Sequence, residues 1–323
     1  MEKTEDRKFN YEDAFEQVKY EVDRLLSTSP LIIRSYTQHL ALSMGKFIRA
    51  ASVITCAMDP QGKIGEKAVK MAAAIEIMHL ATLVHDDVID NADLRRGAPT
   101  LQKQFGKRTA VICGDYLVCM AMRLATSAAE KSDLEEHMKL SIPDYMGKVC
   151  LGELNQHVNN GNVNLSVSQY LRIISGKTAA LFEASFFTGA VLVEKERHVI
   201  RKYAKLGHHI GMIFQLTDDC MDFEETEETA KKPVQSDYEQ NVITLPLIYA
   251  FKTFADFKAK AESRRLSRSE VNEAVQRSGG LRYTRFVAQR YYEKAQKLIE
   301  ELNVPKVKED ELRFLLDKAF RLI

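Results

Sequence analysis

The chain has 323 residues, of which 45% are hydrophobic, with 46 Lys and Arg against 45 Asp and Glu. Its 15 Gly and 7 Pro fall well below the usual share of about 12% of a chain. This scarcity argues against an all-β protein, which needs many tight turns, and against a disordered chain. A net charge of +1 gives no support for a nucleic-acid partner.

Cysteine usage and the N-terminal residues bear on location. The five cysteines are scattered and form no Cys-x-x-Cys pair, which favours reduced thiols inside the cell over disulfides or a zinc site. The first eight residues are mostly charged and contain no apolar signal core. The most apolar stretch, 72–84, is interrupted by Glu76 and His79 and is shorter than the ~20 residues that span a bilayer. We expect a cytoplasmic protein with at most peripheral membrane contact.

Helical periodicity dominates the chain. Phe15, Val18, Val22 and Leu25 recur at three and four residues, as on one face of an amphipathic helix. Further helices are predicted over roughly 45–58, 65–90, 108–130, 134–159, 167–191, 195–223, 242–262, 268–277, 280–302 and 308–321. Strand alternation and flexible linkers are not found in the sequence. The prediction is a single all-α domain over residues 1–323, a bundle of ten or more helices.

Two acidic pentads carry the first chemical signal. Asp86-Asp87-Val88-Ile89-Asp90 and Asp218-Asp219-Cys220-Met221-Asp222 each end an apolar helical stretch. On a helix the first and fifth positions lie one turn apart on one face. Carboxylates there oppose the helix dipole and raise one another's pKa, and a bound Mg²⁺ removes both penalties. One such pentad is typical of a solvated helix end, whereas two favour a metal site.

Cationic side chains suit an anionic ligand near these carboxylates. Four short basic segments stand along the chain, at Lys46 and Arg49, Arg95-Arg96, Lys177 and Lys231-Lys232. Each alone is typical of a solvated surface. Gly176-Lys177-Thr178 lacks the glycine-rich run of a P-loop, so nucleotide binding is poorly supported.

At this point the sequence resembles a known family, the trans-type polyprenyl diphosphate synthases, which elongate isoprenyl chains head to tail. Segment 79–97 is similar to the family's first aspartate-rich motif with its trailing arginines, and segment 214–222 to the second. Lys46 and Arg49, Lys177-Thr178, Lys232-Pro233 and Thr244-Leu-Pro-Leu follow in the family's order. The motifs cover roughly residues 35–255. The chain looks like a medium- or long-chain member, similar to hexaprenyl and heptaprenyl diphosphate synthase catalytic subunits.

The resemblance implies the isoprenoid synthase fold, with a deep central cavity and the two pentads facing each other across its mouth. Several Mg²⁺ ions are implied, bound by Asp86, Asp90 and Asp218, with further candidate ligands at Asp87, Asp219 and Asp222. The implied ligands of the allylic diphosphate are Arg95, Lys177, Thr178, Gln215 and Lys232. Those of isopentenyl diphosphate are Lys46, Arg49, His79 and Arg96. The residues assigned to catalysis itself are Asp86, Asp87, Asp90, Lys177, Thr178, Gln215 and Asp218.

The implied reaction is ionisation of the allylic diphosphate, attack by the double bond of isopentenyl diphosphate, and loss of a proton. A homodimer is expected from the family, and a heterodimer with a smaller subunit remains an alternative.

The sequence departs from the family pattern at several positions. Phe47 and Ala50 stand where the first basic motif often has Arg and Pro, and Gln235 replaces a usual Gly. Asn241-Val242 stands where many members carry Gly-Lys and use that lysine on the diphosphate. These departures leave open the substrate affinity and the dependence on a partner subunit.

Chain length is expected to depend on the helix wall before the first pentad. Ala81 stands five residues before Asp86, where short-chain members tend to have an aromatic ring, and Thr82 is next to it. Small residues there imply an open tunnel and a product of thirty carbons or more. A core-packed Ala81, with Met78 forming the floor, is the alternative.

Three other functions are weighed against the synthase. Glu76-x-x-His79 matches half of a di-iron motif, but a second copy is absent from the sequence. A terpene cyclase also ionises a diphosphate, yet it needs neither the isopentenyl-diphosphate cations nor a full second pentad. A non-catalytic subunit or scaffold has no reason to place six aspartates against apolar helices.

Overall fold

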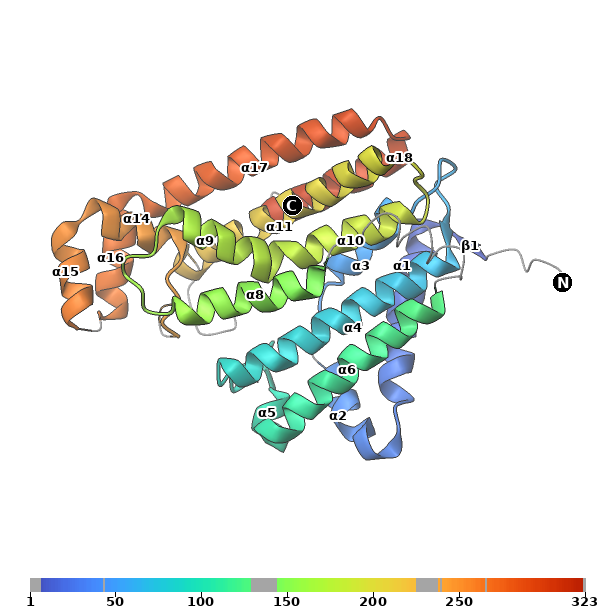
Figure 1. Cartoon of the computed structure of the whole chain (residues 1–323), viewed down its shortest axis with the longest axis horizontal. Coiled ribbons are helices and arrows are strands. Elements are labelled where there is room, and N and C mark those ends of the chain that lie inside the picture. Colours follow the sequence, from blue (N-terminus) through green and yellow to red (C-terminus); the bar gives the residue numbers. More distant parts are fainter. Residues whose placement is uncertain are drawn as a thin grey trace. The chain divides into compact units, whose positions relative to one another are not determined.

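The computed structural model describes residues 7–42, 44–128, 144–224, 238, 240–264 and 266–321. The described chain is almost entirely helical, and its only strands are four two-residue segments (Figure 1). The predicted all-α class with ten or more helices is confirmed. Two compact units are distinguished, unit 1 within residues 1–143, 184–204 and 302–312, and unit 2 within residues 144–183, 205–301 and 313–323. The single-domain organisation stays a prediction.

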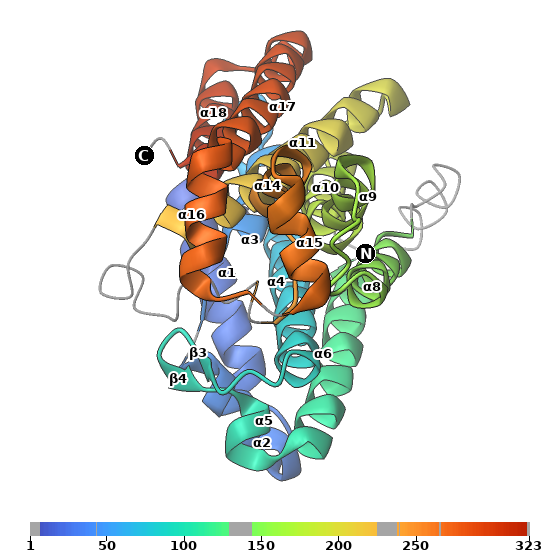
Figure 2. The same ribbon diagram turned by 90° about the vertical axis from the view of Figure 1, so that its left-hand side faces the viewer.

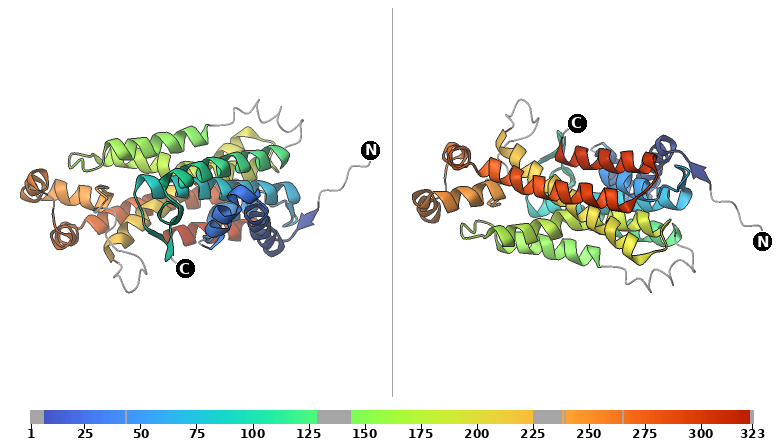
Figure 3. Two further views of the ribbon diagram at one scale, coloured as in Figure 1. Left: turned by 90° about the horizontal axis from the view of Figure 1, so that it is seen from below. Right: turned by 90° about the horizontal axis from the view of Figure 1, so that it is seen from above.

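Unit 1 is built around a long apolar helix, α4, which packs against α1, α3 and α6 (Figures 1 and 3). Its elements are β1 (Lys8–Phe9), α1 (Tyr11–Ser27), α2 (Leu31–Ala41), α3 (Ile48–Cys56), β2 (Ile64–Gly65), α4 (Glu66–Ile89), β3 (Leu94–Arg95), β4 (Ala98–Pro99), α5 (Leu101–Phe105) and α6 (Lys107–Ala128). β1 pairs antiparallel with β2, and β3 with β4. The β3–β4 hairpin lies between α4 and α5 in the chain (Figure 2).

The amphipathic α1 shows how sequence sets the packing of unit 1. Asn10 Oδ1 accepts the backbone N–H of Asp13 at 2.8 Å and so caps the first turn. Val18 and Val22, both predicted for the apolar face, are buried. α4 is apolar on nearly all sides, as a helix in the middle of a bundle must be, because neighbours cover most of its surface.

Unit 2 places α8 alongside α9 and the short π-helix η1 (Figures 1 and 3). Its elements are α8 (Tyr145–Val158), α9 (Val167–Ile174), η1 (Ser175–Ala179), α14 (Leu245–Thr253), α15 (Ala255–Ser263), α16 (Arg268–Ser278) and, except for its last residue, α17 (Gly280–Leu302). Both units include parts of α10 (Ala180–Val191), α11 (Arg197–Glu224) and α18 (Lys306–Phe320). Side chains of α9, α11, α14 and α16 form the core of unit 2.

The structure corrects two of the predicted helices. Residues 167–191 do not form one α-helix, because a π-helical segment separates α9 from α10. Residues 242–262 divide into α14 and α15 at Phe254, whose backbone is extended (φ −121°, ψ 98°). The break lets the rings of Phe251 and Phe257 stack with centroids 5.3 Å apart. Of the predicted helix 134–159, residues 134–143 lie outside the described part of the chain.

Two described helices, α4 and α6, are long and apolar enough to cross a membrane by length and composition alone. The apolar stretch 72–84 thus belongs to a 24-residue helix. Over the most apolar window of α4, 56% of residues are buried inside the protein, against 39% for α6. Core helices of bundles pass the same test, so this is weak evidence for a membrane span, and the expected peripheral contact stays a prediction.

Candidate active site

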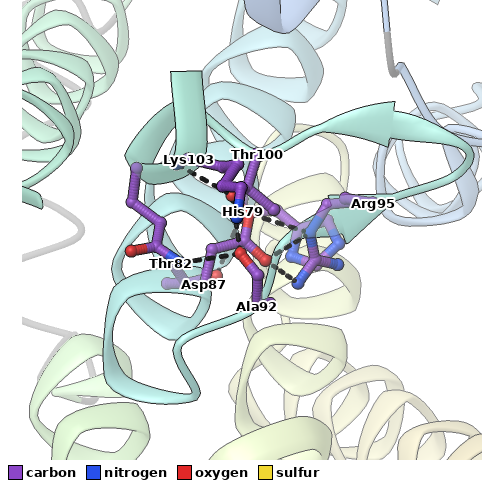
Figure 4. Close-up of polar contacts among 8 residues, drawn as sticks. His79, Thr82, Asp87, Ala92, Arg95, Thr100 and Lys103 are labelled. Carbon is purple, nitrogen blue, oxygen red and sulfur yellow. Dashed lines mark hydrogen bonds and ion pairs between the residues drawn. The ribbon is translucent and has the colours of Figure 1, made fainter. Parts of the chain in front are cut away.

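The first pentad ends α4, and its middle carboxylate is committed to an arginine. Asp87 is only 5% exposed, whereas Asp86 and Asp90 are partly exposed. Arg95 Nε and Nη2 donate to Asp87 Oδ1 at 2.9 and 2.8 Å (Figure 4). This fork-like pairing is strong and directional because both groups are charged and planar. Asp86 and Asp90 therefore remain the more accessible carboxylates of this pentad.

A tight hairpin brings Arg95 back to the helix it follows. Leu94 pairs with Pro99 and Arg95 with Ala98, and the turn residues Arg96 and Gly97 have φ values of 53° and 81°. Two consecutive positive φ angles are typical of the turn that matches the twist of a two-residue hairpin. Positive φ is uncommon for a residue with a side chain, so Arg96 is held in a strained conformation.

The loop before α5 is fixed by bonds to one carbonyl. Thr100 Oγ1 and Gln102 Nε2 donate to the carbonyl oxygen of Ala92 at 2.6 and 2.7 Å (Figure 4). Thr100 also caps α5 by accepting the N–H of Lys103. The segment between the pentad and α5 is therefore anchored at its start and end, which limits the positions open to the hairpin.

A second set of cations in unit 1 surrounds the start of α3. Arg49 Nη1 lies 3.0 Å from His79 Nε2. Since a guanidinium can only donate, Nε2 must accept, and the ring proton belongs on Nδ1. Burial lowers the pKa of Arg49 to about 10, and burial together with the neighbouring arginines holds the pKa of His79 well below its usual value. The guanidinium of Arg96 packs against Gly45, where a Cβ atom would lie 2.8 Å from its nitrogens. Lys46 is exposed.

Glu76 is the counter-charge in this cluster, and sequence reasoning assigned it only to a di-iron alternative. Its Oε1 accepts the backbone N–H of Ala50 at 2.9 Å and so caps α3 from a different helix. α3 needs such a cap because the residue before it, Phe47, has φ 54° and no capping side chain. Burial raises the pKa of Glu76, while the Ala50 N–H and Arg49 oppose this. The signal in the sequence was a carboxylate interrupting an apolar run.

The second pentad lies on α11 in unit 2 and repeats the pattern of the first. Asp219 is 1% exposed, whereas Asp218 and Asp222 are partly exposed. Asp219 accepts hydrogen bonds from the Tyr170 hydroxyl and, at 2.8 Å, from Gln215 Nε2. Burial raises the pKa of Asp219 to about 7 against the effect of these bonds. Sequence reasoning missed Tyr170, which lies 49 residues away and belongs to no acidic or basic motif.

Lys177 and Thr178 lie in the π-helix η1. Thr178 Oγ1 donates to Gln215 Oε1 at 2.7 Å, and Lys177 Nζ lies 2.9 Å from Glu153 Oε2. η1 touches α8 through glycines, since a Cβ on Gly152 would lie 2.2 Å from the Lys177 nitrogen. π-helical turns of this kind are rare and frequently occur at functional sites.

Other predicted residues are placed individually. Lys232, with Lys231, Pro233 and Gln235, lies outside the described residues. Asn241 has φ 62°, a conformation that Gly adopts freely and that Asn tolerates. Ala81 is fully buried, and Thr82 and Met78 are partly exposed. Thr82 Oγ1 bonds back to the His79 carbonyl at 2.8 Å (Figure 4).

Among the residues that the structure describes, no group of three or more His, Cys, Asp or Glu side chains is arranged to hold a metal ion. The di-iron alternative therefore gains no support from Glu76 and His79. A Mg²⁺ site of the predicted kind does not require such a group, because Mg²⁺ is usually bound by one or two carboxylates together with substrate phosphates and water.

The sequence model of the polyprenyl synthetase family matches residues 30–278. The chain belongs to the polyprenyl synthetase family. It is 33% identical over 297 residues to heptaprenyl diphosphate synthase component 2 of Geobacillus stearothermophilus, covering 90% of both chains. It is 30% identical over 286 residues to octaprenyl diphosphate synthase of Escherichia coli, covering 86% of both.

Solved structures give the same assignment. The polyprenyl synthetase is similar to heptaprenyl diphosphate synthase from Staphylococcus aureus, with TM-score 0.85, 32% identity and coverage of 97% and 98% of the two chains. It is also similar to a polyprenyl synthase from Caulobacter crescentus complexed with calcium and isoprenyl diphosphate, with TM-score 0.82, 29% identity and coverage of 96% and 94%. The resemblance drawn from the motifs and the isoprenoid synthase fold are therefore confirmed, and this polyprenyl synthetase is a prenyltransferase.

Proposed function

We propose that the enzyme condenses isopentenyl diphosphate head to tail with an allylic diphosphate, using several Mg²⁺ ions, and releases a medium- or long-chain all-trans polyprenyl diphosphate. The observation that carries the proposal is the shared design of the two pentads, in which the second aspartate is buried and hydrogen-bonded while the first and fifth are partly exposed. Relatives named heptaprenyl and octaprenyl diphosphate synthase support the longer products.

The metal ligands in this proposal are the partly exposed aspartates Asp86, Asp90, Asp218 and Asp222. Asp218 Oδ1 also accepts from Arg321 Nη2 at 2.8 Å, so a metal ion would compete with this pair. Bound Mg²⁺ supplies charge stabilisation to the departing diphosphate. Asp87 and Asp219 are buried and both oxygens of each accept hydrogen bonds, so we assign them to positioning, and metal binding by these two stays a prediction. The calcium in the Caulobacter crescentus structure supports a divalent metal in this family.

The cations divide between the two substrates. Arg49, Arg96 and Lys46 are proposed to hold isopentenyl diphosphate, since Arg suits bidentate phosphate recognition. His79, whose Nε2 accepts from Arg49, orients that guanidinium and has an N–H left on Nδ1. The residues assigned to the allylic diphosphate are Arg95, Lys177, Thr178, Gln215 and Lys232.

The reaction follows from this charge distribution. The bond between the allylic carbon and its diphosphate oxygen breaks, and both electrons leave with the oxygen. The double bond of isopentenyl diphosphate then forms the new carbon–carbon bond, and transfer of a proton from the resulting cation to the departed diphosphate restores a double bond. Lys177 is held by Glu153 before the substrate arrives, so the ammonium is already positioned when negative charge develops on the leaving group.

The test is incubation of purified protein with labelled isopentenyl diphosphate, farnesyl diphosphate and Mg²⁺, with products separated by chain length. We expect polyprenyl products that disappear with EDTA, and a loss of at least about 100-fold for Asp86→Asn. Asp93→Asn, which removes an exposed carboxylate of the neighbouring loop, is the matched control. An inactive wild type, both alone and with any co-encoded partner, contradicts the proposal.

Product length is proposed to depend on Ala81, Thr82 and Met78. Ala81 is fully buried, so an aromatic ring at this position must displace neighbouring side chains. Thr82 and Met78 are partly exposed. We expect Ala81→Phe to shorten the products, and Met78→Phe serves as the comparison. An unchanged product distribution in Ala81→Phe contradicts a role for this position.

A second candidate is a catalytic subunit that needs a partner, because one relative is named as component 2 of a heptaprenyl diphosphate synthase. Exposed apolar side chains suit an interface with a partner subunit or with a second copy of the chain. They are Val111, Ile112 and Met122 on α6 and Leu151, Leu154 and Val158 on α8.

Of these two alternatives, we propose that the chain forms a homodimer through α6 and α8. Light scattering should give a dimer for wild type and a monomer for Ile112→Glu, while a wild-type monomer favours the heteromeric alternative. The central cavity and the cytoplasmic location stay predictions.

A further inference from the structure

We propose that Tyr170 is a positioning residue for allylic diphosphate binding, which orders Gln215 and Thr178 through Asp219. The inference rests on the proposed function and adds to it a residue that lies outside both pentads and every basic motif. Of the three links, one joins α9 to α11, one lies within α11, and one joins α11 to η1, and all four residues belong to unit 2.

The direction of each bond follows from the chemistry of the groups. An ionised Asp219 only accepts, so the Tyr170 hydroxyl donates to Oδ2 and Gln215 Nε2 donates to Oδ1 at 2.8 Å. The amide oxygen of Gln215 is thereby turned toward Thr178, whose Oγ1 donates to it at 2.7 Å. Rotating the amide by half a turn would set its oxygen against the carboxylate, so Asp219 excludes the alternative orientation.

This arrangement determines what the site can offer a ligand. Thr178 donates its one hydroxyl proton to Gln215, so it fixes the amide and, while this bond holds, has no proton to offer the diphosphate. Gln215 donates one of its two amide N–H groups to Asp219, and the other can donate to an anion. If Asp219 were not fixed in place, the Gln215 amide could rotate by half a turn. The anion would then face the amide oxygen in some molecules and the amide N–H in others.

Tyr170 acts only through these groups. It is 3% exposed and Asp219 is 1% exposed, so neither presents a surface to a substrate. Tyr170 itself is held firmly, because its helix starts with a reciprocal cap between Ser166 and Gln169 and its ring packs in the core of unit 2. A rigid donor on one helix thus fixes a carboxylate on another.

The decisive comparison is Tyr170→Phe with Tyr292→Phe. The control also removes a hydroxyl that donates to an aspartate on another helix of unit 2, since Tyr292 bonds Asp317 at 2.6 Å, but it touches no proposed site residue. We expect Tyr170→Phe to raise KM for the allylic diphosphate about tenfold, the effect of one lost hydrogen bond, with KM for isopentenyl diphosphate within about twofold of wild type. Tyr292→Phe should leave both values unchanged.

A binding readout separates this inference from the proposed function. Titration of Mg²⁺ and inorganic pyrophosphate into each protein should show about tenfold weaker binding for Tyr170→Phe and no change for Tyr292→Phe, even if the enzyme prefers unexpected substrates. Equal pyrophosphate affinity for Tyr170→Phe and wild type overturns the inference while leaving the synthase activity standing. A wild type that binds no pyrophosphate overturns it as well.

A double-mutant cycle excludes a purely structural effect. In a Gln215→Leu background, Tyr170→Phe should cost little further affinity, because the group it positions is gone. The same loss in both backgrounds contradicts the positioning role. Should Tyr170→Phe fail to fold, Asp219→Asn tests the same link, since an amide there no longer excludes the wrong orientation of Gln215, and unchanged pyrophosphate affinity then counts against the inference.

Discussion

The two units fix the polar groups around their aspartate pentads by different means. In unit 1 the contacts join charged side chains, with Arg95 paired to Asp87 and Arg96 packed against Gly45 at the tip of a short hairpin. In unit 2 neutral donors hold Asp219, and the backbone of η1 presses directly against α8 at Gly152. The buried aspartate of unit 1 is therefore held by charge pairing, whereas that of unit 2 is held by neutral hydrogen bonds, in a unit where two helices pack backbone against backbone.

The difference predicts that a methyl group added to a glycine is tolerated in unit 1 and not in unit 2. A Cβ on Gly152 would lie 2.2 Å from the backbone nitrogen of Lys177 and 2.5 Å from the carbonyl carbon of Gly176. Because backbone atoms cannot turn aside, Gly152→Ala should lower the free energy of unfolding by about 3 kcal/mol, despite the better helix propensity of Ala. Denaturant unfolding measures this. A loss below about 1 kcal/mol would show that η1 and α8 are not rigidly packed.

The charge pairing of unit 1 is tested by Arg95→Met. Asp87, with 7% side-chain exposure, would lose its partner, and we expect a loss of about 2 kcal/mol, less than for a fully buried pair because Arg95 is 30% exposed. Lys103→Met is the control, since its pair with Asp93 in the same loop is exposed and should contribute less than about 1 kcal/mol. Equal effects of the two variants on the thermal unfolding midpoint argue against a special role for the Arg95 pair.

The free energy of unfolding should depend on pH through Asp219, because this buried carboxylate is held by neutral donors and not by a cation. Burial raises the pKa of Asp219 to about 7 from 3.8, so the folded protein binds more protons than the unfolded chain between these values. In metal-free buffer the stabilising contribution of protonated Asp219 is full below pH 4 and is lost as the pH rises toward 7. Asp219→Asn should remove this dependence, which amounts to about 4 kcal/mol for a pKa change of this size. Parallel curves of unfolding free energy against pH for wild type and variant contradict the assignment.

The smallest effect on stability is expected for Gly45→Ala, yet it should impair binding. The new Cβ meets only the far end of the Arg96 side chain, which can move, so the free energy of unfolding should change by less than about 1 kcal/mol. The displaced guanidinium should raise KM for isopentenyl diphosphate several-fold and leave KM for the allylic substrate unchanged. Steady-state kinetics with each substrate varied in turn measures both values, and a variant with unaltered KM for isopentenyl diphosphate removes Arg96 from that site.

Local sequence identified most of the groups that meet within each unit. The spacing of Asp86 and Asp90 indicated two carboxylates on one helix face. The family resemblance alone assigned Arg49, His79 and Arg96 to one substrate site. The structure places Arg49 beside His79 and Arg96 against Gly45. Such predictions are open to the sequence because they depend on residues a few positions apart or on an ordered set of motifs, and the roles of these residues stay predictions.

Residues whose roles depend on distant contacts were missed or assigned to another chemistry. Glu76 looked like half of a di-iron motif, and only the position of α3 shows that it caps that helix at Ala50. Tyr170 carried no signal at all, because its partner lies on another helix. The π-helix at Lys177 could not be predicted from the sequence either. It occurs where Gly176 of η1 lies against Gly152 of α8, and this contact depends on packing.

By itself, the sequence determined the helical class, the positions of both acidic pentads and the family, because periodicity, breaker content and motif order are properties of the chain. Only the tertiary structure decided which aspartate of each pentad is buried with both oxygens hydrogen-bonded, and which two are partly exposed. Asp87 and Asp219 hold the same place in identical motifs, yet one pairs with a guanidinium and the other with a phenol and an amide. Burial and hydrogen-bond partners come from packing, and packing joins residues that the linear pattern keeps apart.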